Sequence, residues 1–312
     1  MHLNKTRSYK LLYLVIILII FSFSTMKIID LYKISIYRYY LSKRCILNVT
    51  ENTGSNGTSS KTSGAVNVLP WENDDRYLDG MRNTGSTVLL AAFRTVLKDP
   101  LPGEEFNVHH AADLLAGTVV KPGEIFSQNR LLGPYIASKG YQWGPTYAGS
   151  ELIKTIGGGV CKIASTLYNV AILSNLDIIE RHPHGMPVPY VPYGQDATVS
   201  YGSKDFRFIN NTPYPVLIWA KGIGNELYIA FYGRLVPEKI EWQHETLKVY
   251  KASSRYKKNK DLPLGEERVI LEGMDGVSVR SWLNITKYDG TVVIRQLGIS
   301  NYNPMPHLIE RG

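Results

Sequence analysis

The stretch Ile156–Tyr168 reads IGGGVCKIASTLY, and it sets the centre of the expected fold. Three consecutive glycines lead into Cys161, one of only two cysteines among 312 residues. The apolar residues that follow recur on one helical face, namely Ala164, Leu167, Ala171 and Ile172. The pattern predicts a helix over residues 161–175, with the cysteine in its first turn and a hinge without side chains before it.

Short apolar runs around this helix predict strands that pack against it. Residues 86–97 (STVLLAAFRTVL) have the composition of a buried strand, and residues 119–127 indicate a strand broken by a Pro-Gly turn. A second helix is predicted over 107–115, capped by Asn107. Further strands are predicted at 205–210, 214–220 and 225–233. The predicted fold class is α+β, with antiparallel β-sheets packed around the helix that begins at Cys161.

Residues 76–235 are predicted to form the main domain, and residues 236–312 a second, small β-domain. In the second unit, the runs 276–288 and 291–298 flank Asp289-Gly290, which is a strong signal for a hairpin. The basic run at residues 253–261 (SSRYKKNKD) is interpreted as a solvated loop.

The N-terminal part has the pattern of a membrane anchor. Residues 11–29 (LLYLVIILIIFSFSTMKII) are almost entirely apolar and long enough to cross a bilayer. Residues 1–45 hold eight basic residues and one acidic residue, which is nearly all of the net charge of +8. Basic residues around an apolar run favour an uncleaved signal anchor, a single-pass transmembrane helix with residues 1–10 in the cytoplasm, and argue against a nucleic-acid partner. Residues 30–75 are then a juxtamembrane segment and flexible linker.

Cys161 has the surroundings expected of a nucleophile. The first turn of a helix offers unpaired N–H groups and the positive end of the dipole, which lower a thiol pKa from about 8.5 toward about 3.5–7.5. Lys162 adds positive charge beside the thiol. The glycines allow close approach of a substrate and place N–H groups near a developing oxyanion. The predicted substrate-binding residues therefore include Gly157, Gly158, Gly159 and Lys162.

A base for the thiol is expected in the next loop, RHPHG. His182 and His184 flank a proline, so on extended chain both rings point to one face and either can meet Cys161. The candidates to orient that histidine are Asp196 and Asp205. Glu124, in KPGEIF, is added to the substrate-binding set because core formation does not explain its position.

Two other interpretations of these residues stay open at this point. In the first, Cys161 is an inert, packed residue behind a tight glycine turn. In the second, Cys161, His182 and His184 form a zinc site with one open position. The nucleophile interpretation requires no metal and no cofactor.

Three long stretches resemble the VanW family, in the order expected of that family. They are residues 117–134, 140–172 and 178–218. The resemblance spans residues 87–233, and the family, named after an accessory gene of vancomycin-resistance clusters, occurs in bacterial envelope proteins. The tail, residues 261–297, resembles the small five-glycine (G-five) β-domain often found beside cell-wall enzymes.

The resemblance implies that the domain lies outside the cytoplasmic membrane, facing peptidoglycan. It also implies that the domain catalyses L,D-transpeptidation. In this reaction a cysteine attacks the L,D-peptide bond of a stem tetrapeptide and passes the acyl group to an amine on a neighbouring stem. Carried over by motif, Cys161 is the nucleophile and His182 or His184 the base. Gly158 and Gly159 would shape the oxyanion site.

One position departs from the family pattern, because Lys162 stands where the family usually has glutamine. The alternative function is a non-catalytic peptidoglycan-binding accessory protein, associated with glycopeptide resistance or envelope maintenance. In that case Cys161 only packs.

Overall fold

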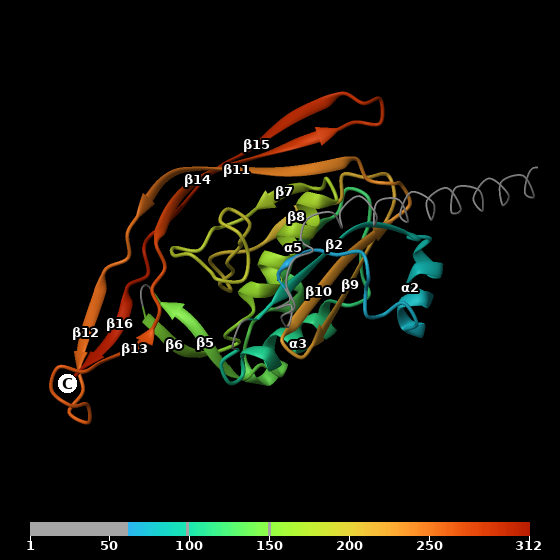
Figure 1. The fold of residues 1–312 in the computed structure, drawn as a ribbon. Helices are drawn as coiled ribbons and strands as arrows, with labels where there is room; N and C mark the ends of the chain where they lie inside the picture. Colours follow the sequence, from blue (N-terminus) through green and yellow to red (C-terminus); the bar gives the residue numbers. More distant parts are fainter. Residues whose placement is uncertain (1–61, 98–99, 149–150) are drawn as a thin grey trace, which may run out of the picture. The chain divides into compact units, whose positions relative to one another are not determined.

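A five-stranded antiparallel sheet carries the main core (Figure 1). The structure is a computed structural model that describes residues 62–97, 100–148 and 151–312. In sheet order, the strands are β1 (Gly64–Ala65), β2 (Val88–Val96), β10 (Glu226–Gly233), β9 (Val216–Ile223) and β3 (Thr118–Val120).

Alternate residues of this sheet are buried on opposite faces. Ile218 packs into the core on the face covered by helices α3 (Glu104–Leu115) and α5 (Cys161–Leu173). Its neighbour Leu217 packs on the other face, against helix α2 (Asp75–Thr84). Burial on both faces explains why these strands have continuous apolar sequences instead of alternating ones.

Helix α5 lies at the centre of the core, as predicted. Every residue from Ile163 to Ile172 is buried, and the helix contacts β2 and β10 on the sheet. The α+β class, with antiparallel strands around the helix that begins at Cys161, is confirmed. The helix ends at Leu173, two residues before the predicted end, because Asn175 adopts a left-handed conformation with φ of 57°.

Smaller elements surround the start of α5. A three-stranded antiparallel sheet has the order β4 (Ile125–Ser127), β8 (Arg207–Ile209) and β7 (Asp177–Glu180). Strands β5 (Trp143–Ala148) and β6 (Glu151–Ile156) form a hairpin that leads into the glycines. The short helices are α4 (Gln128–Leu132) and the 3-10 turn η1 (Ala137–Lys139).

The C-terminal part consists of two three-stranded sheets. The first has the order β11 (Lys239–Tyr250), β14 (Gly276–Thr286) and β15 (Val292–Tyr302). The second has the order β12 (Ser254–Lys258), β16 (His307–Arg311) and β13 (Glu267–Leu271), with β12 and β16 parallel. The hairpin at Asp289-Gly290 is confirmed, because β14 and β15 pair across it.

The interpretation of residues 253–261 as a solvated loop was wrong for most of the run. Residues Ser254–Lys258 are strand β12, although all five side chains are exposed. Backbone pairing with β16 compensates for the missing apolar face, and the Arg311 guanidinium stacks on the Tyr256 ring at 4.1 Å.

The predicted cap at Asn107 was also wrong. Helix α3 begins at Glu104, after Gly103 with φ of 85°, so Asn107 lies inside the helix and is fully buried. Its side-chain amide donates to the carbonyl oxygens of Gln142 and Gly158, at 2.9 Å each. Asn107 thus links α3 to the β5–β6 hairpin and to the glycine turn.

The described fold includes residues before Arg76, inside the segment 30–75. Trp71 is 1 % exposed, and its indole N–H donates to the Tyr232 hydroxyl at 2.9 Å. None of the helices in the described residues is long and apolar enough to span a membrane. The predicted anchor at residues 11–29 lies outside the described residues.

Candidate active site

The turn before α5 fixes the position of Cys161. Gly157 and Gly159 have φ of 80° and 105°, a region that residues with a Cβ rarely adopt. Gly158 lies against β5, where a Cβ atom would stand 2.2 Å from the Gly144 carbonyl oxygen. The three glycines therefore allow a sharp turn that packs against the β5–β6 hairpin and places Cys161 at the first position of the helix.

Polar side chains on α5 hold the segment that carries Asp196. The Ser165 hydroxyl donates to the Ala197 carbonyl oxygen at 3.1 Å and accepts the Ala197 N–H at 2.9 Å. Asn169, one turn further along α5, donates to the Gln195 carbonyl oxygen at 2.8 Å. These bonds hold the residues on both sides of Asp196 against the helix.

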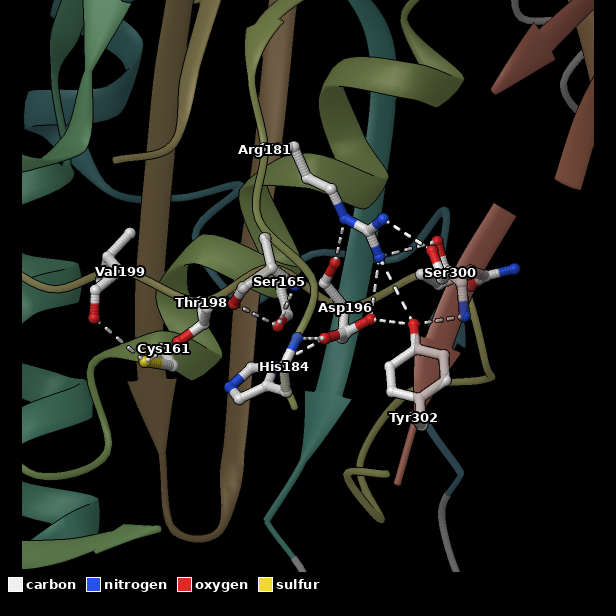
Figure 2. Close-up of polar contacts among 12 residues, drawn as sticks. Cys161, Ser165, Arg181, His184, Asp196, Thr198, Val199, Ser300 and Tyr302 are labelled. Carbon is white, nitrogen blue, oxygen red and sulfur yellow. Dashed lines mark hydrogen bonds and ion pairs between the residues drawn. The ribbon is translucent and has the colours of Figure 1, made fainter. Parts of the chain in front are cut away.

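Cys161, His184 and Asp196 form a linear arrangement beside the start of α5 (Figure 2). His184 Nδ1 lies 2.6 Å from Asp196 Oδ2, and the second ring nitrogen faces Cys161. The Cys161 Sγ atom lies 3.4 Å from the Thr198 hydroxyl and 3.6 Å from the Val199 carbonyl oxygen. This order of thiol, imidazole and carboxylate is the arrangement that activates a nucleophilic cysteine.

The second carboxylate oxygen of Asp196 is also fully engaged. Arg181 Nη2 donates to Oδ1 at 2.9 Å, and the Tyr302 hydroxyl donates to the same atom. The Asp196 side chain is 1 % exposed, so its negative charge is stabilised by these partners and by His184 instead of by water. Burial, followed by the nearby charge of Asp196, raises the pKa of Tyr302, which keeps that hydroxyl a proton donor.

The electrostatics of the site favour a thiolate–imidazolium pair at neutral pH. Burial alone would raise the pKa of Cys161, but hydrogen bonding and charge from His184, with the contacts to Thr198 and Val199, lower it to about 7. Burial alone would lower the pKa of His184, but Asp196 and Cys161 raise it to about 9. Despite burial, His184 and Arg181 hold the pKa of Asp196 below its usual value. Near neutral pH, Cys161 is thus substantially ionised while His184 is protonated.

A cavity of about 650 Å³ opens onto the thiol. Cys161 and His184 line it, together with three tyrosines and an ion pair. The tyrosines are Tyr135, Tyr190 and Tyr201. The ion pair joins Lys162 Nζ to Glu104, and the ammonium lies 4.7 Å from the centre of the Tyr190 ring. The thiol therefore faces a space large enough for part of a peptide, with aromatic and charged walls.

Two backbone amides at the mouth of α5 are suited to an oxyanion. The hydrogen bonds of the described residues leave the N–H groups of Gly159 and Cys161 without an acceptor, and both residues line the cavity. Gly158 differs from its predicted role, because its N–H donates to Thr155 at 3.2 Å and it is not among the lining residues. The amides of Gly159 and Cys161 thus form the candidate oxyanion site.

The structure separates the two candidate histidines. His182 Nε2 lies 3.0 Å from Glu180 Oε1, and that carboxylate also accepts the Asp205 N–H and contacts Arg207. The two rings contact different carboxylates, His182 that of Glu180 and His184 that of Asp196, so the expectation that both face Cys161 was wrong. Only His184 of this pair lines the cavity.

Glu124 and Asp205 have structural roles elsewhere. Glu124 accepts the Lys121 N–H at 3.0 Å across the Pro-Gly turn and lies 3.8 Å from Arg130. Asp205 accepts the Asn129 N–H at 2.9 Å in the first turn of α4. Neither residue lines the cavity that holds Cys161, so the structure does not bring them into the site.

The three proposed zinc ligands are not arranged around a common point. It required Cys161, His182 and His184 as three ligands, but His182 pairs with Glu180. Within residues 62–97, 100–148 and 151–312, no group of three His, Cys, Asp or Glu side chains is arranged to hold a metal ion.

Several residues of the site carry no local sequence signal. Ser165 and Asn169 read as polar interruptions of an apolar helix, and Thr198 lies in an irregular loop. Arg181 and Tyr302 are 121 positions apart, and their side chains lie 3.4 Å apart beside Asp196. Polar residues on the otherwise apolar α5 were the one available signal, because a buried hydroxyl or amide requires a partner.

Comparison with known proteins assigns the central part of the chain to a family. Residues 103–232 match the family described as "VanW like protein". The chain carries a VanW-like domain. This range includes α5, the glycine turn, His184 and Asp196, whereas Tyr302 lies outside it.

Two curated relatives match part of the chain. "Uncharacterized protein YoaR" of Bacillus subtilis (strain 168) is 39 % identical over 147 residues, which is 47 % of this chain and 48 % of that protein. "Vancomycin B-type resistance protein VanW" of Enterococcus faecalis (strain ATCC 700802 / V583) is 36 % identical over 119 residues, 36 % of this chain and 43 % of that protein. The chain thus spans about half the length of the curated relatives that it matches.

Two solved G5 domains match a smaller part of the chain. "Crystal structure of HP0197-G5" is 17 % identical and covers 24 % of this chain and 99 % of its own, with a TM-score of 0.15. "IgA1 Protease G5 domain structure" is 24 % identical and covers 24 % of this chain and 89 % of its own, with a TM-score of 0.16.

Proposed function

We propose that the chain is a cysteine acyltransferase of the bacterial cell wall that acts on stem peptides of peptidoglycan, as an L,D-transpeptidase. The observation that carries the proposal is that Cys161, His184 and Asp196 interact in this order at the wall of a cavity. The relatives support the cell-wall setting, since one is described as a vancomycin B-type resistance protein.

The first half of the proposed reaction forms a thioester. The Cys161 thiolate attacks the carbonyl carbon of the peptide bond, and the negative charge on the carbonyl oxygen is met by the amides of Gly159 and Cys161. The carbon–nitrogen bond then breaks as His184 gives its proton to the leaving amine. The acyl group remains on the sulfur, and His184 is left neutral.

The second half transfers the acyl group to an amine. Neutral His184 takes a proton from the incoming amine, whose nitrogen attacks the thioester carbon. The carbon–sulfur bond breaks, a new amide forms, and the thiolate–imidazolium pair is restored. Asp196 keeps Nδ1 protonated through both halves, so proton transfer takes place at the nitrogen that faces Cys161.

The walls of the cavity suit a charged peptide. Lys162 and Glu104 offer one cation and one anion beside the thiol, and the tyrosines offer flat apolar surfaces with a polar tip. We place the folded part outside the cytoplasmic membrane, on the side of the cell wall, with residues 11–29 as the membrane anchor.

The test is incubation of the full chain, solubilised in detergent, with disaccharide-tetrapeptide muropeptides, followed by intact-protein mass spectrometry and product analysis. Wild type is compared with Cys161→Ala and with His182→Gln, a matched change in the same loop outside the site. We expect a covalent acyl adduct and dimeric products in wild type and in His182→Gln, and neither in Cys161→Ala.

The main alternative is a wall-binding accessory protein without catalysis. It predicts equal muropeptide binding by wild type and Cys161→Ala, with no adduct and no product in either. That result would refute the acyltransferase.

A further inference from the structure

The end of strand β15 reaches the centre of the candidate active site, although it lies outside the VanW-like domain. Tyr302 is 2 % exposed, and its hydroxyl donates to Asp196 Oδ1. The same hydroxyl accepts the Gly194 N–H at 2.9 Å, two residues before Asp196. Figure 2 shows this ring on the side of the carboxylate opposite to His184.

Two more contacts tie β15 to the loops that carry the site. The Asn303 N–H donates to the Gly185 carbonyl oxygen at 2.9 Å, directly after His184. The Ser300 hydroxyl accepts from Arg181 Nη1 at 2.8 Å, and Arg181 in turn donates to Asp196. Residues 300–303 therefore contact the chain on both sides of the His184–Asp196 pair.

The carboxylate has four groups with a charge or a titrating proton around it. His184 and Arg181 come from the loop after β7, Tyr168 from α5 and Tyr302 from β15. With Arg181 and Tyr302 on Oδ1 and His184 on Oδ2, the plane of the carboxylate is fixed. Loss of the tyrosine hydroxyl removes one donor from this set and leaves the buried Gly194 N–H without its acceptor.

We infer that Tyr302 is a positioning residue of the reaction proposed above, and that it acts on Cys161 through Asp196 and His184. The inference rests on the proposed function, in which Cys161 is the nucleophile. What it predicts directly is the reactivity of the Cys161 thiol. The C-terminal strands are then part of the active site and not only an appended module. Ser300 assists through Arg181.

The test measures how fast iodoacetamide alkylates Cys161 as a function of pH, using the full chain in detergent. Alkylation requires the thiolate and no cell-wall substrate, so the result is independent of transpeptidation. A Cys45→Ala background leaves Cys161 as the single cysteine. The variants are Tyr302→Phe, Ser300→Ala and the control Tyr288→Phe, which loses a hydrogen bond to Val236 in the same β14–β15 hairpin, away from Asp196.

Without the Tyr302 hydroxyl the plane of the Asp196 carboxylate is no longer fixed, so His184 is held less firmly beside the thiolate. For Tyr302→Phe we therefore expect the pH at which the alkylation rate rises to increase by about one unit, which lowers the rate about tenfold below the transition. Ser300→Ala is expected to move it in the same direction by less, and Tyr288→Phe to leave it unchanged. Thermal unfolding of each variant checks that it is folded. Should Tyr302→Phe not fold, the Ser300→Ala profile decides, because that change removes a smaller group.

Profiles of Tyr302→Phe and Ser300→Ala that overlay wild type would overturn the inference. A wild-type thiol that titrates at its ordinary value would instead remove the proposed nucleophile, so the two failures are distinguishable. A shifted profile in Tyr302→Phe together with the absence of muropeptide products would keep the positioning role and reject the transpeptidase.

Discussion

His184 is bound twice by Asp196: its Nδ1 atom lies 2.6 Å from Oδ2, and its backbone N–H donates to the same oxygen at 2.7 Å. The ring cannot rotate away without breaking its contact with a buried carboxylate. The Asp196 carboxylate thus keeps the proton on Nδ1 of His184 and directs the second ring nitrogen toward Cys161.

The pH dependence of the thiol follows from the two pKa values. Because the pKa of Cys161 is about 7, alkylation is expected to rise as the pH passes about 7. Acyl transfer also needs protonated His184, so kcat/KM for muropeptides is expected to fall again as the pH passes about 9. Rates measured across this range check both limbs. A single rise centred at the ordinary thiol value of about 8.5 would contradict the thiolate–imidazolium pair.

The two histidines are expected to respond differently to the same substitution. His184→Gln removes the base and the cation beside the thiolate, so acyl transfer should fall by about 10²–10⁴-fold. His182→Gln removes a partner of Glu180 at the surface and should change the rate by less than about threefold, as expected of a surface substitution. Initial rates at neutral pH compare the two. Equal losses would mean that His182 also acts on Cys161.

Gly158 is expected to tolerate no side chain. In Gly158→Ala the new methyl group would meet the Gly144 carbonyl oxygen at 2.2 Å, so the hairpin or the start of α5 must shift. Overpacking of this kind costs about 1–3 kcal/mol of unfolding free energy, and the shift should also slow alkylation of Cys161. The control is Gly64→Ala, where nothing lies within 4 Å. Denaturant unfolding that gives equal stability for both variants would contradict the packing.

The Lys162–Glu104 pair is expected to stabilise the entrance of the cavity. Its side chains are 13 % and 10 % exposed, so Lys162→Met leaves a nearly buried carboxylate without its partner. We expect a loss of about 3 kcal/mol, the lower end for a broken buried pair. The double variant Lys162→Met with Glu104→Met should recover much of it. A double-mutant cycle measured by chemical unfolding gives the coupling, and additive effects would count against the pair.

Much of the fold follows from local patterns in the sequence. The helix at Cys161 and the hairpin at Asp289-Gly290 were predicted because apolar period and turn residues are local signals. Strand β12 was missed because its five side chains are all exposed, so no apolar pattern exists to indicate it. The start of α3 was misplaced because Asn107 has the chemistry of a cap but is used inside the helix.

The candidate site was predicted in part, for an equally physical reason. Cys161 is marked by its rarity and by the glycines before it. The choice between His182 and His184 depends on which carboxylate each ring meets in the fold, Glu180 or Asp196, and the i, i+2 spacing does not contain that information. Glu124 was proposed for the site on its unusual position, and its carboxylate in fact closes a turn.

Local sequence patterns were enough to predict the α+β class, the central helix and the residue types of the site, because an apolar period, a glycine run or a rare cysteine can be recognised within a few positions. Which histidine meets the thiol depends on the three-dimensional fold, and so does the contact of Tyr302 with Asp196, which lies 106 residues away in the chain. Hydrogen bonds of a buried carboxylate are satisfied by whichever donors the fold brings near, whatever their distance along the chain.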